Sequence, residues 1–189
     1  MVTVSHIAKK IVSGQPFIEE ALGSRIISFG NLAEQIAEHR KKASRFDFTG
    51  EILMKTNICD FSVVKSPSLL VKLRTIYNIV NFERGNTLNV ILGNNEVSII
   101  INEKYMQKLT KFLAEEKILN KEHDLVALTI IFTADDFTHT PGVIFNAVRK
   151  LAWENINIYE IVSTMTELTF ILSNKDSMKA YNVLHELTN

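Results

Sequence analysis

The strongest constraint on the fold of this sequence is an internal repeat in its C-terminal part. Three pairs of like residues recur at separations of 71 to 74 positions: Pro67 and Pro141, Glu96 and Glu167, and Met106 and Met178. Both copies show the hydrophobic pattern of a strand, a helix, two strands and a helix. This order predicts an α+β fold of two ferredoxin-like βαββα units, each an antiparallel sheet with two helices on one face.

The first copy is expected between residues 50 and 120. Its predicted elements are strands at 52–54 and 61–64, a helix that opens at Ser66-Pro67, strands at 88–92 and 96–101, and a helix at 105–113. Gly93-Asn94-Asn95 predicts a hairpin between the two later strands, because these residues accept positive φ angles. Residues 114–124 are charged and predict a connection, with a short strand at 118–119 as an alternative.

The second copy is expected between residues 124 and 189. Its predicted elements are strands at 125–133, 158–162 and 168–172 and helices at 143–155 and 175–187. The turn between the last two strands is expected at 164–166. An antiparallel sheet with helices on one face leaves its other face and its edges to be covered. Pairing of the two copies within the chain, or dimerisation, would cover them.

Residues 1–45 form a separate region whose apolar spacing predicts three short helices, similar to a helix-turn-helix module. Seven basic and four acidic side chains give this head a charge of about +3, which is a weak electrostatic footprint for nucleic acid; the basic residues are Lys9, Lys10, Arg25, Arg40, Lys41, Lys42 and Arg45. DNA binding and docking to a protein therefore remain alternative functions for the head.

Composition excludes several classes of function. The formal net charge is zero, which gives no general attraction to nucleic acid or to anionic membranes. No apolar run reaches about 18 residues, so we expect no membrane span and a cytoplasmic protein. The single cysteine, Cys59, lies in an apolar run and is expected to be a buried structural thiol. The five histidines lack metal-ligand spacing, and we expect no metal, no cofactor and no catalytic site.

The residues of the second copy carry a family resemblance. The segments Ala134–Val143 and Asn155–Ile158, followed by Ser163, Glu167 and Leu168–Leu172, resemble an ACT domain. The nearest similarity is to the tandem regulatory half of aspartate kinases, although no catalytic domain and no phosphate-binding glycine loop occur here. The similarity covers about residues 124–187 well and extends weakly, through the repeat, to about 50–120.

The N-terminal head resembles a second group of proteins. Pro16–Leu22, Ile26–Phe29 and Leu32-Ala33 are similar to the helical head of a small microbial family. Those proteins join a winged-helix-like segment to ACT units and are regarded as regulators of amino-acid metabolism.

The resemblance implies an amino-acid site near the junction of the strand at 125–133 with the next helix. The candidate ligand-binding residues are Asp135, Asp136, Thr138, Thr140, Gly142, Val143, Asn157 and Ser163. Backbone N–H groups at the start of the helix suit a carboxylate, and an aspartate suits an ammonium group. Each side chain also has a purely structural interpretation: Thr140 as a helix cap, the aspartates as solvated loop acids, Asn157 as a strand-to-loop tie and Ser163 as a turn residue.

These features together predict a non-enzymatic regulatory protein that senses a small metabolite, most simply an amino acid, and passes the signal to a partner. We expect a homodimer, with DNA or a biosynthetic enzyme as the partner. One alternative is an interaction subunit that binds no ligand, and another is an amino-acid-responsive DNA-binding regulator. The first unit has the shorter junction Val64–Pro67, so we expect it to be structural.

Overall fold

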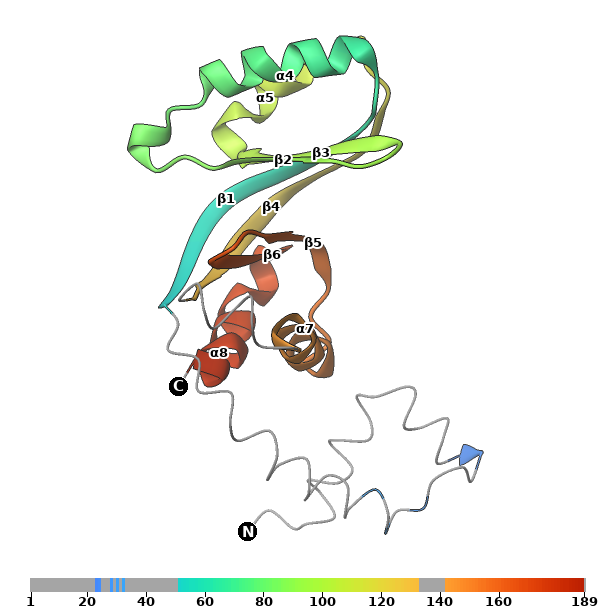
Figure 1. Cartoon of the computed structure of the whole chain (residues 1–189), viewed down its shortest axis with the longest axis vertical. Coiled ribbons are helices and arrows are strands. Elements are labelled where there is room, and N and C mark those ends of the chain that lie inside the picture. The colour runs from blue at the N-terminus through green and yellow to red at the C-terminus, as the bar shows by residue number, and fades with distance from the viewer. Residues whose placement is uncertain are drawn as a thin grey trace.

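The computed structural model describes residues 51–132 and 142–188, together with five positions between residues 23 and 32. Within this part, the two copies have the predicted order of elements (Figure 1). The first unit consists of β1 (Glu51–Val64), α4 (Pro67–Ile79), β2 (Leu88–Leu92), β3 (Glu96–Asn102) and α5 (Met106–Phe112). The second consists of β4 (Ile118–Ile131), α7 (Val143–Trp153), β5 (Ile158–Ser163), β6 (Glu167–Ser173) and α8 (Ser177–Thr188). The predicted helical head lies outside the described residues.

The six strands form one antiparallel sheet in the order β2-β3-β1-β4-β6-β5. The long strands β1 and β4 pair with each other along almost their whole length, and each contributes side chains to the cores of both units. Figure 1 shows the half-sheet of β2 and β3 stacked on the half-sheet of β5 and β6, with the helices on the two outer sides. The inner faces of the two units therefore cover each other, which confirms pairing of the copies within the chain.

Two of the strands are longer than predicted. β1 is continuous from Glu51 to Val64, so the prediction of two strands around residues 55–57 is wrong. β4 starts at Ile118, so the charged connection predicted for 114–124 is mostly strand. Irregular register near the middle of the β1–β4 pair explains the error. Asn57 and Asp124 have positive φ angles of 57° and 55° at equivalent points of the two strands, and polar residues at such bulges resemble loops in a sequence.

Three apolar clusters hold these layers together. In the first unit Phe61, Ile99 and Leu109 belong to a cluster between the half-sheet, α4 and α5. In the second unit Leu128 and Phe170 belong to the matching cluster beneath α7 and α8. A third cluster joins the inner faces of the two units; its buried members are Ile58, Ile100, Leu125, Ala127 and Ile171. Burial of apolar area on both faces of the strands accounts for their near-continuous apolar sequence.

The two copies resemble each other more in structure than their sequences indicate. β1 and β4 each contain 14 residues, and their last nine residues have identical burial patterns. β3 and β6 each contain seven residues and also share one burial pattern. Equivalent positions therefore differ by 67 in the first pair of strands and by 71 in the second. Cys59 is fully buried in β1, as predicted, and its thiol donates a 3.4 Å hydrogen bond to the carbonyl of Ile101.

Candidate functional site

The N-terminus of α7 is the part of the sequence-predicted site that the structure describes. Gly142 is the N-cap, with a left-handed φ of 87°, and α7 begins at Val143. The alternative role of Thr140 as a helix cap concerns a residue outside the described part of the chain. Gly142 has no side chain that could accept hydrogen bonds from the first turn, and that turn, Val143–Asn146, contains no acidic residue. The positive end of the helix dipole is thus not neutralised by its own first turn.

The other predicted residues divide into three groups. Asp135, Asp136, Thr138 and Thr140 lie outside the described residues. The side chain of Val143 is only 5 % exposed and belongs to the core of the second unit, so only its backbone is suited to a ligand. Asn157 and Ser163 are exposed; Asn157 immediately precedes β5 and Ser163 is its last residue.

The structure does not bring Asn157 together with Gly142. Gly142 precedes α7, whereas Asn157 follows it, and the backbone N–H of Ile156 bonds to the carbonyl of Leu151 in the last turn. A helix of 11 residues is about 16 Å long at about 1.5 Å per residue. Asn157 and Ser163 are separated in the same way by β5, over about 17–20 Å at about 3.3 Å per residue. One small ligand therefore does not contact all three residues of a single chain.

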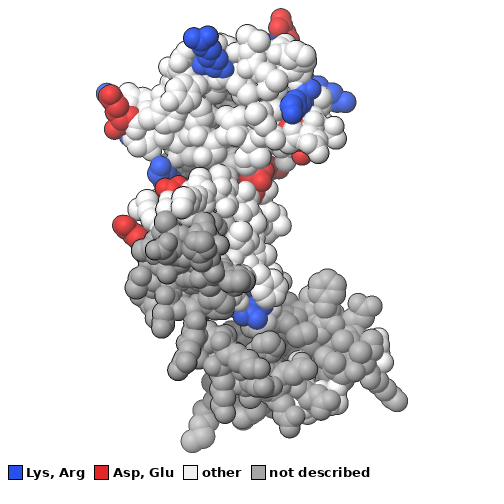
Figure 2. Space-filling view, in the orientation of Figure 1, with Lys and Arg blue, Asp and Glu red and all other residues white. Residues whose placement is uncertain are grey.

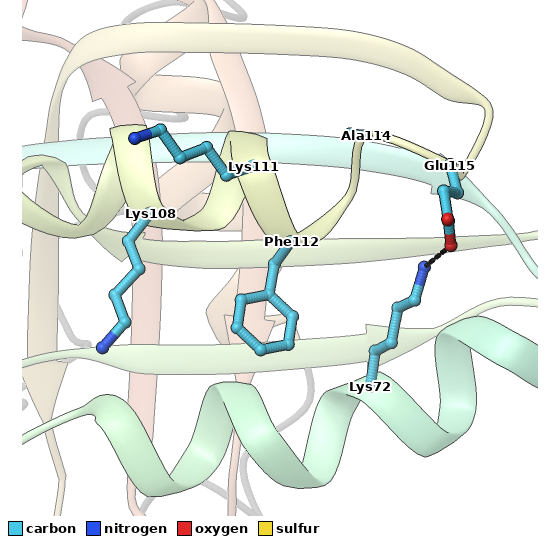
Figure 3. A pocket seen from close by; sticks show the side chains of 6 residues that line it. All are labelled: Lys72, Lys108, Lys111, Phe112, Ala114 and Glu115. Atoms are coloured by element: carbon cyan, nitrogen blue, oxygen red, sulfur yellow. Dashed lines mark hydrogen bonds and ion pairs between the residues drawn. The ribbon is translucent and has the colours of Figure 1, made fainter.

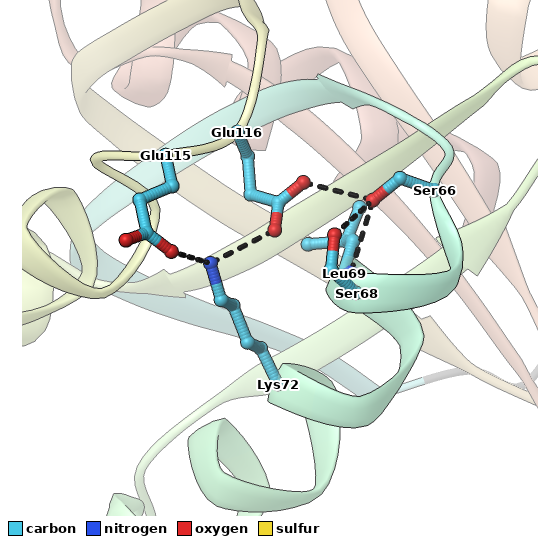
Figure 4. Close-up of polar contacts among 6 residues, drawn as sticks. All are labelled: Ser66, Ser68, Leu69, Lys72, Glu115 and Glu116. Atoms are coloured by element: carbon cyan, nitrogen blue, oxygen red, sulfur yellow. Dashed lines mark hydrogen bonds and ion pairs between the residues drawn. The ribbon is translucent and has the colours of Figure 1, made fainter.

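At the equivalent junction of the first unit, between β1 and α4, side chains of the chain itself satisfy the N-terminus of the helix. Ser66 caps α4: its hydroxyl accepts a 3.0 Å hydrogen bond from the N–H of Leu69, and Pro67 is the first helical residue, as predicted. The Ser66 hydroxyl also lies 2.8 Å from a carboxylate oxygen of Glu116 (Figure 4). Glu116 precedes β4 and supplies a negative charge beside the N-terminus of α4.

Glu116 is held in place by Lys72. The two side chains form a 2.9 Å ion pair, and Lys72 also lies 3.4 Å from Glu115. The hydrogen bonds from Lys72 and Ser66 lower the pKa of Glu116, and the bond to Glu116 raises the pKa of Lys72. A carboxylate from the chain therefore stands where a ligand carboxylate would bind at this junction, in agreement with a structural role for the first unit.

A groove of about 550 Å³ lies between α4 and α5 (Figure 3). Lys72 reaches into it from α4, and Lys108, Lys111 and Phe112 border it from α5, with Glu115 at one end. Lys72 is already paired with Glu115 and Glu116, so the unsatisfied positive charge of the groove comes from α5. Figure 2 shows acidic and basic side chains interspersed on the face of the described residues that is in view in the orientation of Figure 1. This face therefore lacks the concentrated positive charge that nucleic acid requires.

The sequence did not identify a second polar region, between the two units. Thr129 and Thr169 are cross-strand neighbours on the inner face of the second unit, with their hydroxyl oxygens 2.8 Å apart. Lys55, which the sequence places in a loop, is part of β1 and lies with them around one cavity. Side chains alternate between the two faces of a strand, so Thr129 in β4 and Thr169 in β6 lie on the face of the sheet that points away from the helices. This alternation can be read from the sequence alone.

The described part of the chain contains neither a cluster of metal-ligating side chains nor a membrane-spanning helix. No group of three or more His, Cys, Asp or Glu residues there is arranged to hold a metal ion. Among the same residues, no helix is long and apolar enough to cross a membrane.

Comparison with known proteins identifies the fold. No protein-family model matches the sequence, and no curated protein matches it. Among solved structures, the ligand-free regulatory subunit of aspartate kinase from Thermus thermophilus matches with a TM-score of 0.60 at 14 % identity, over 76 % of this chain and 99 % of that subunit. A regulatory domain assigned to aspartate kinase from Porphyromonas gingivalis matches at 0.55 and 18 % identity, over 76 % and 100 % of the two chains.

A whole enzyme matches in the same region. E. coli aspartokinase III in complex with lysine and aspartate matches with a TM-score of 0.55 at 12 % identity, over 77 % of this chain but only 35 % of the enzyme. The first two of these matches are themselves a regulatory subunit and a regulatory domain of aspartate kinase. The described part of the chain therefore has the α+β fold of the tandem ACT domains that regulate aspartate kinases.

Proposed function

We propose that this chain is a non-enzymatic, cytoplasmic regulatory protein that senses an amino acid through its ACT units and transmits the signal to a partner. The observation that carries the proposal is the complete tandem ACT fold: the chain spans 99 % of a protein that is itself a separate regulatory subunit. DNA and a biosynthetic enzyme are the two partner classes. The N-terminal head is the proposed contact to either of them.

The difference between the two helix N-termini supports the second unit as the sensing unit. At α4 the N-terminus is satisfied by the Ser66 hydroxyl and the Glu116 carboxylate. At α7 the cap is a glycine, which lets a ligand carboxylate approach the backbone N–H groups closely. Asp135 or Asp136 would then bind the ammonium group, with Thr138 and Thr140 beside them.

The separation of Gly142 from Asn157 supports a dimeric sensor. A ligand at the N-terminus of α7 that also contacts Asn157 must take the asparagine from a second copy, because about 16 Å separates the two positions in one chain. The ligand would then favour one packing of the homodimer over another, which is a shift of population between two states. Sedimentation velocity with and without the effector measures the resulting change in the homodimer.

Thermal unfolding in the presence of each of the twenty amino acids tests the proposal. A ligand at 100 times its dissociation constant adds about 2.7 kcal/mol to the free energy of unfolding. We expect one or two amino acids to raise the Tm of the parent protein, and the same amino acids to have no effect on Asn157→Ala. Asn189→Ala, at the C-terminus, is the matched control. Tm shifts that are all unchanged in Asn157→Ala would exclude this site.

An interaction subunit without a ligand is the second candidate, and a specific observation favours it. Large apolar side chains are exposed on the outer helices, among them Val71 (76 %) and Tyr77 (60 %) on α4 and Phe145 (64 %) and Trp153 (50 %) on α7. Arg149 lies over the rings of Phe145 and Trp153 at 5.5 and 5.3 Å. Exposed apolar surface of this kind is typical of protein interfaces. No Tm shift with any amino acid, together with a stable dimer, would support this function.

A further inference from the structure

A cavity of about 210 Å³ lies between the two units, on the inner face of the second half-sheet. Its floor is formed by Ala127, Thr129 and Thr169, from β4 and β6. Its wall comes from the first unit, at the link between α4 and β2, where Asn86 and Thr87 border it. The cavity is therefore lined by both units.

The repeat explains why space exists at this position. Ala127 in β4 is equivalent to Asp60 in β1, since both are the tenth residue of a 14-residue strand. In the first unit the Asp60 side chain fills the equivalent place and accepts a 2.9 Å hydrogen bond from the Ser98 hydroxyl. In the second unit the methyl group of Ala127 occupies the position of the Asp60 carboxyl group, and Thr169 is the equivalent of Ser98. Replacement of a larger side chain by alanine between two packed faces leaves a cavity.

The wall of the cavity is fixed by hydrogen bonds. The Asn86 side-chain amide donates to the carbonyl of Asn81 at 2.7 Å and to the Tyr105 hydroxyl at 3.0 Å. The backbone N–H of Thr87 donates to the side-chain oxygen of Asn102 at 2.7 Å. The Thr87 hydroxyl is buried and has no hydrogen-bond partner within the described residues. A buried polar group without a partner is uncommon, and a bound polar molecule would give it one.

The cavity also carries one positive and one negative side chain. Lys55 reaches it from β1 and Glu167 from the start of β6. Both are exposed, and the structure shows no ion pair between them. Two side chains of opposite charge that border one polar cavity are complementary to a molecule that carries both signs.

We propose that this cavity binds a small zwitterion, whose anionic group meets Lys55 and whose cationic group meets Glu167. Its polar body lies on the hydroxyl groups of Thr129 and Thr169. The cavity, of about 210 Å³, has room for a ligand of the size of a small α-amino acid. Because both units line the cavity, the bound molecule would stabilise their packing on each other. This site is separate from the proposed sensing site at α7 and does not depend on it.

Isothermal titration calorimetry on the full chain with L-serine, L-threonine and L-asparagine tests this site. We expect at least one of them to bind. Its amide, which lacks the carboxylate, and the corresponding hydroxy acid, which lacks the ammonium group, should not bind. Lys55→Met and Glu167→Gln should each weaken binding by about tenfold or more, as expected for loss of a charge-assisted hydrogen bond. Both residues are exposed, so neither change should alter the Tm without ligand.

Matched variants separate this site from others. Glu96→Gln changes the repeat equivalent of Glu167, and Lys108→Met changes a lysine of the α4–α5 groove; neither should alter the affinity. Ala127→Leu fills the cavity and should abolish binding. Binding that survives Lys55→Met and Glu167→Gln, or absence of binding by all three amino acids, would overturn the inference. Loss of binding in Asn157→Ala alone would instead assign the ligand to the α7 site, so the two proposals fail independently.

Discussion

The Ser98 hydroxyl donates a 2.9 Å hydrogen bond to a carboxylate oxygen of Asp60, which is only 6 % exposed on the inner face of the first unit. Burial raises the pKa of Asp60 above its ordinary value of 3.8; the Ser98 hydrogen bond opposes this shift, and the charges of Glu160 and Glu122 add to it. The carboxylate form is therefore a destabilising feature of the folded protein at neutral pH.

The sign of this effect gives the first prediction. Between pH 3.8 and the raised pKa, the folded state keeps a proton on Asp60 that the unfolded state releases, so stability falls as the pH rises through this window. In Asp60→Asn the amide oxygen still accepts the Ser98 hydrogen bond, but no charge is buried. We expect a higher Tm than the parent at pH 7 and a flatter dependence of Tm on pH. Glu83→Gln, an exposed change, should do neither, and a lower Tm for Asp60→Asn would contradict the argument.

The second prediction concerns Cys59. This thiol is fully buried between β1 and the helices, and burial raises its pKa to about 12. The reactive thiolate is therefore scarce and inaccessible at pH 8. We expect no labelling by a thiol reagent in the native protein and one label per chain in denaturant. Fast labelling of the native protein would mean that β1 separates from the helices without global unfolding.

The third prediction concerns the cap of α4. Ser66→Ala removes the acceptor for the N–H of Leu69 and a hydrogen-bond partner of Glu116. Loss of a serine N-cap costs about 1 kcal/mol, and the Tm of a protein of this size should fall by about 2–4 °C. Ser68→Ala, two residues along the same helix, does not remove the cap and should have a smaller effect. Equal effects of the two changes would argue against capping as the main contribution.

The fourth prediction concerns Gly142. Its φ of 87° is unfavourable for residues with a Cβ, although among the described residues the nearest atom to an added Cβ would be the Asn146 amide nitrogen at 4.0 Å. No described side chain therefore obstructs the methyl group, and the cost of Gly142→Ala is backbone strain of about 1–2 kcal/mol. Gly142→Asn should recover part of this loss, because asparagine tolerates the left-handed region. Chemical denaturation curves measure both, and an unchanged midpoint for Gly142→Ala would show that this φ is not required.

Local signals predicted most of the fold correctly. Gly93-Asn94-Asn95 located the β2–β3 hairpin, which is closed by a 2.9 Å bond from the N–H of Gly93 to the carbonyl of Glu96. Ser66-Pro67 located the start of α4. These features depend on neighbouring residues only. The continuity of β1 through Asn57 was missed, because it depends on pairing with β4, more than 60 residues away in the sequence.

The candidate site was less predictable for a physical reason. The motif residues Gly142 and Asn157 are close in sequence, but a helix between them carries them to opposite ends of the unit. The cavity between the units was missed because its floor and its wall come from strands and links of different copies. Only the stacking of the two half-sheets brings Lys55, Thr87 and Thr169 around one space.

The long strands β1 and β4 have a consequence for how such a protein changes during evolution. Ile52 and Met54, at the start of β1, pack against the core of the second unit, although they belong to the first copy in the sequence. Deletion of either copy would remove part of the core of the other copy. It would also leave the edge of the remaining long strand, β1 or β4, unpaired. A chain break or a recombination joint between the two copies would therefore disrupt both cores, and the pair is expected to fold as one unit.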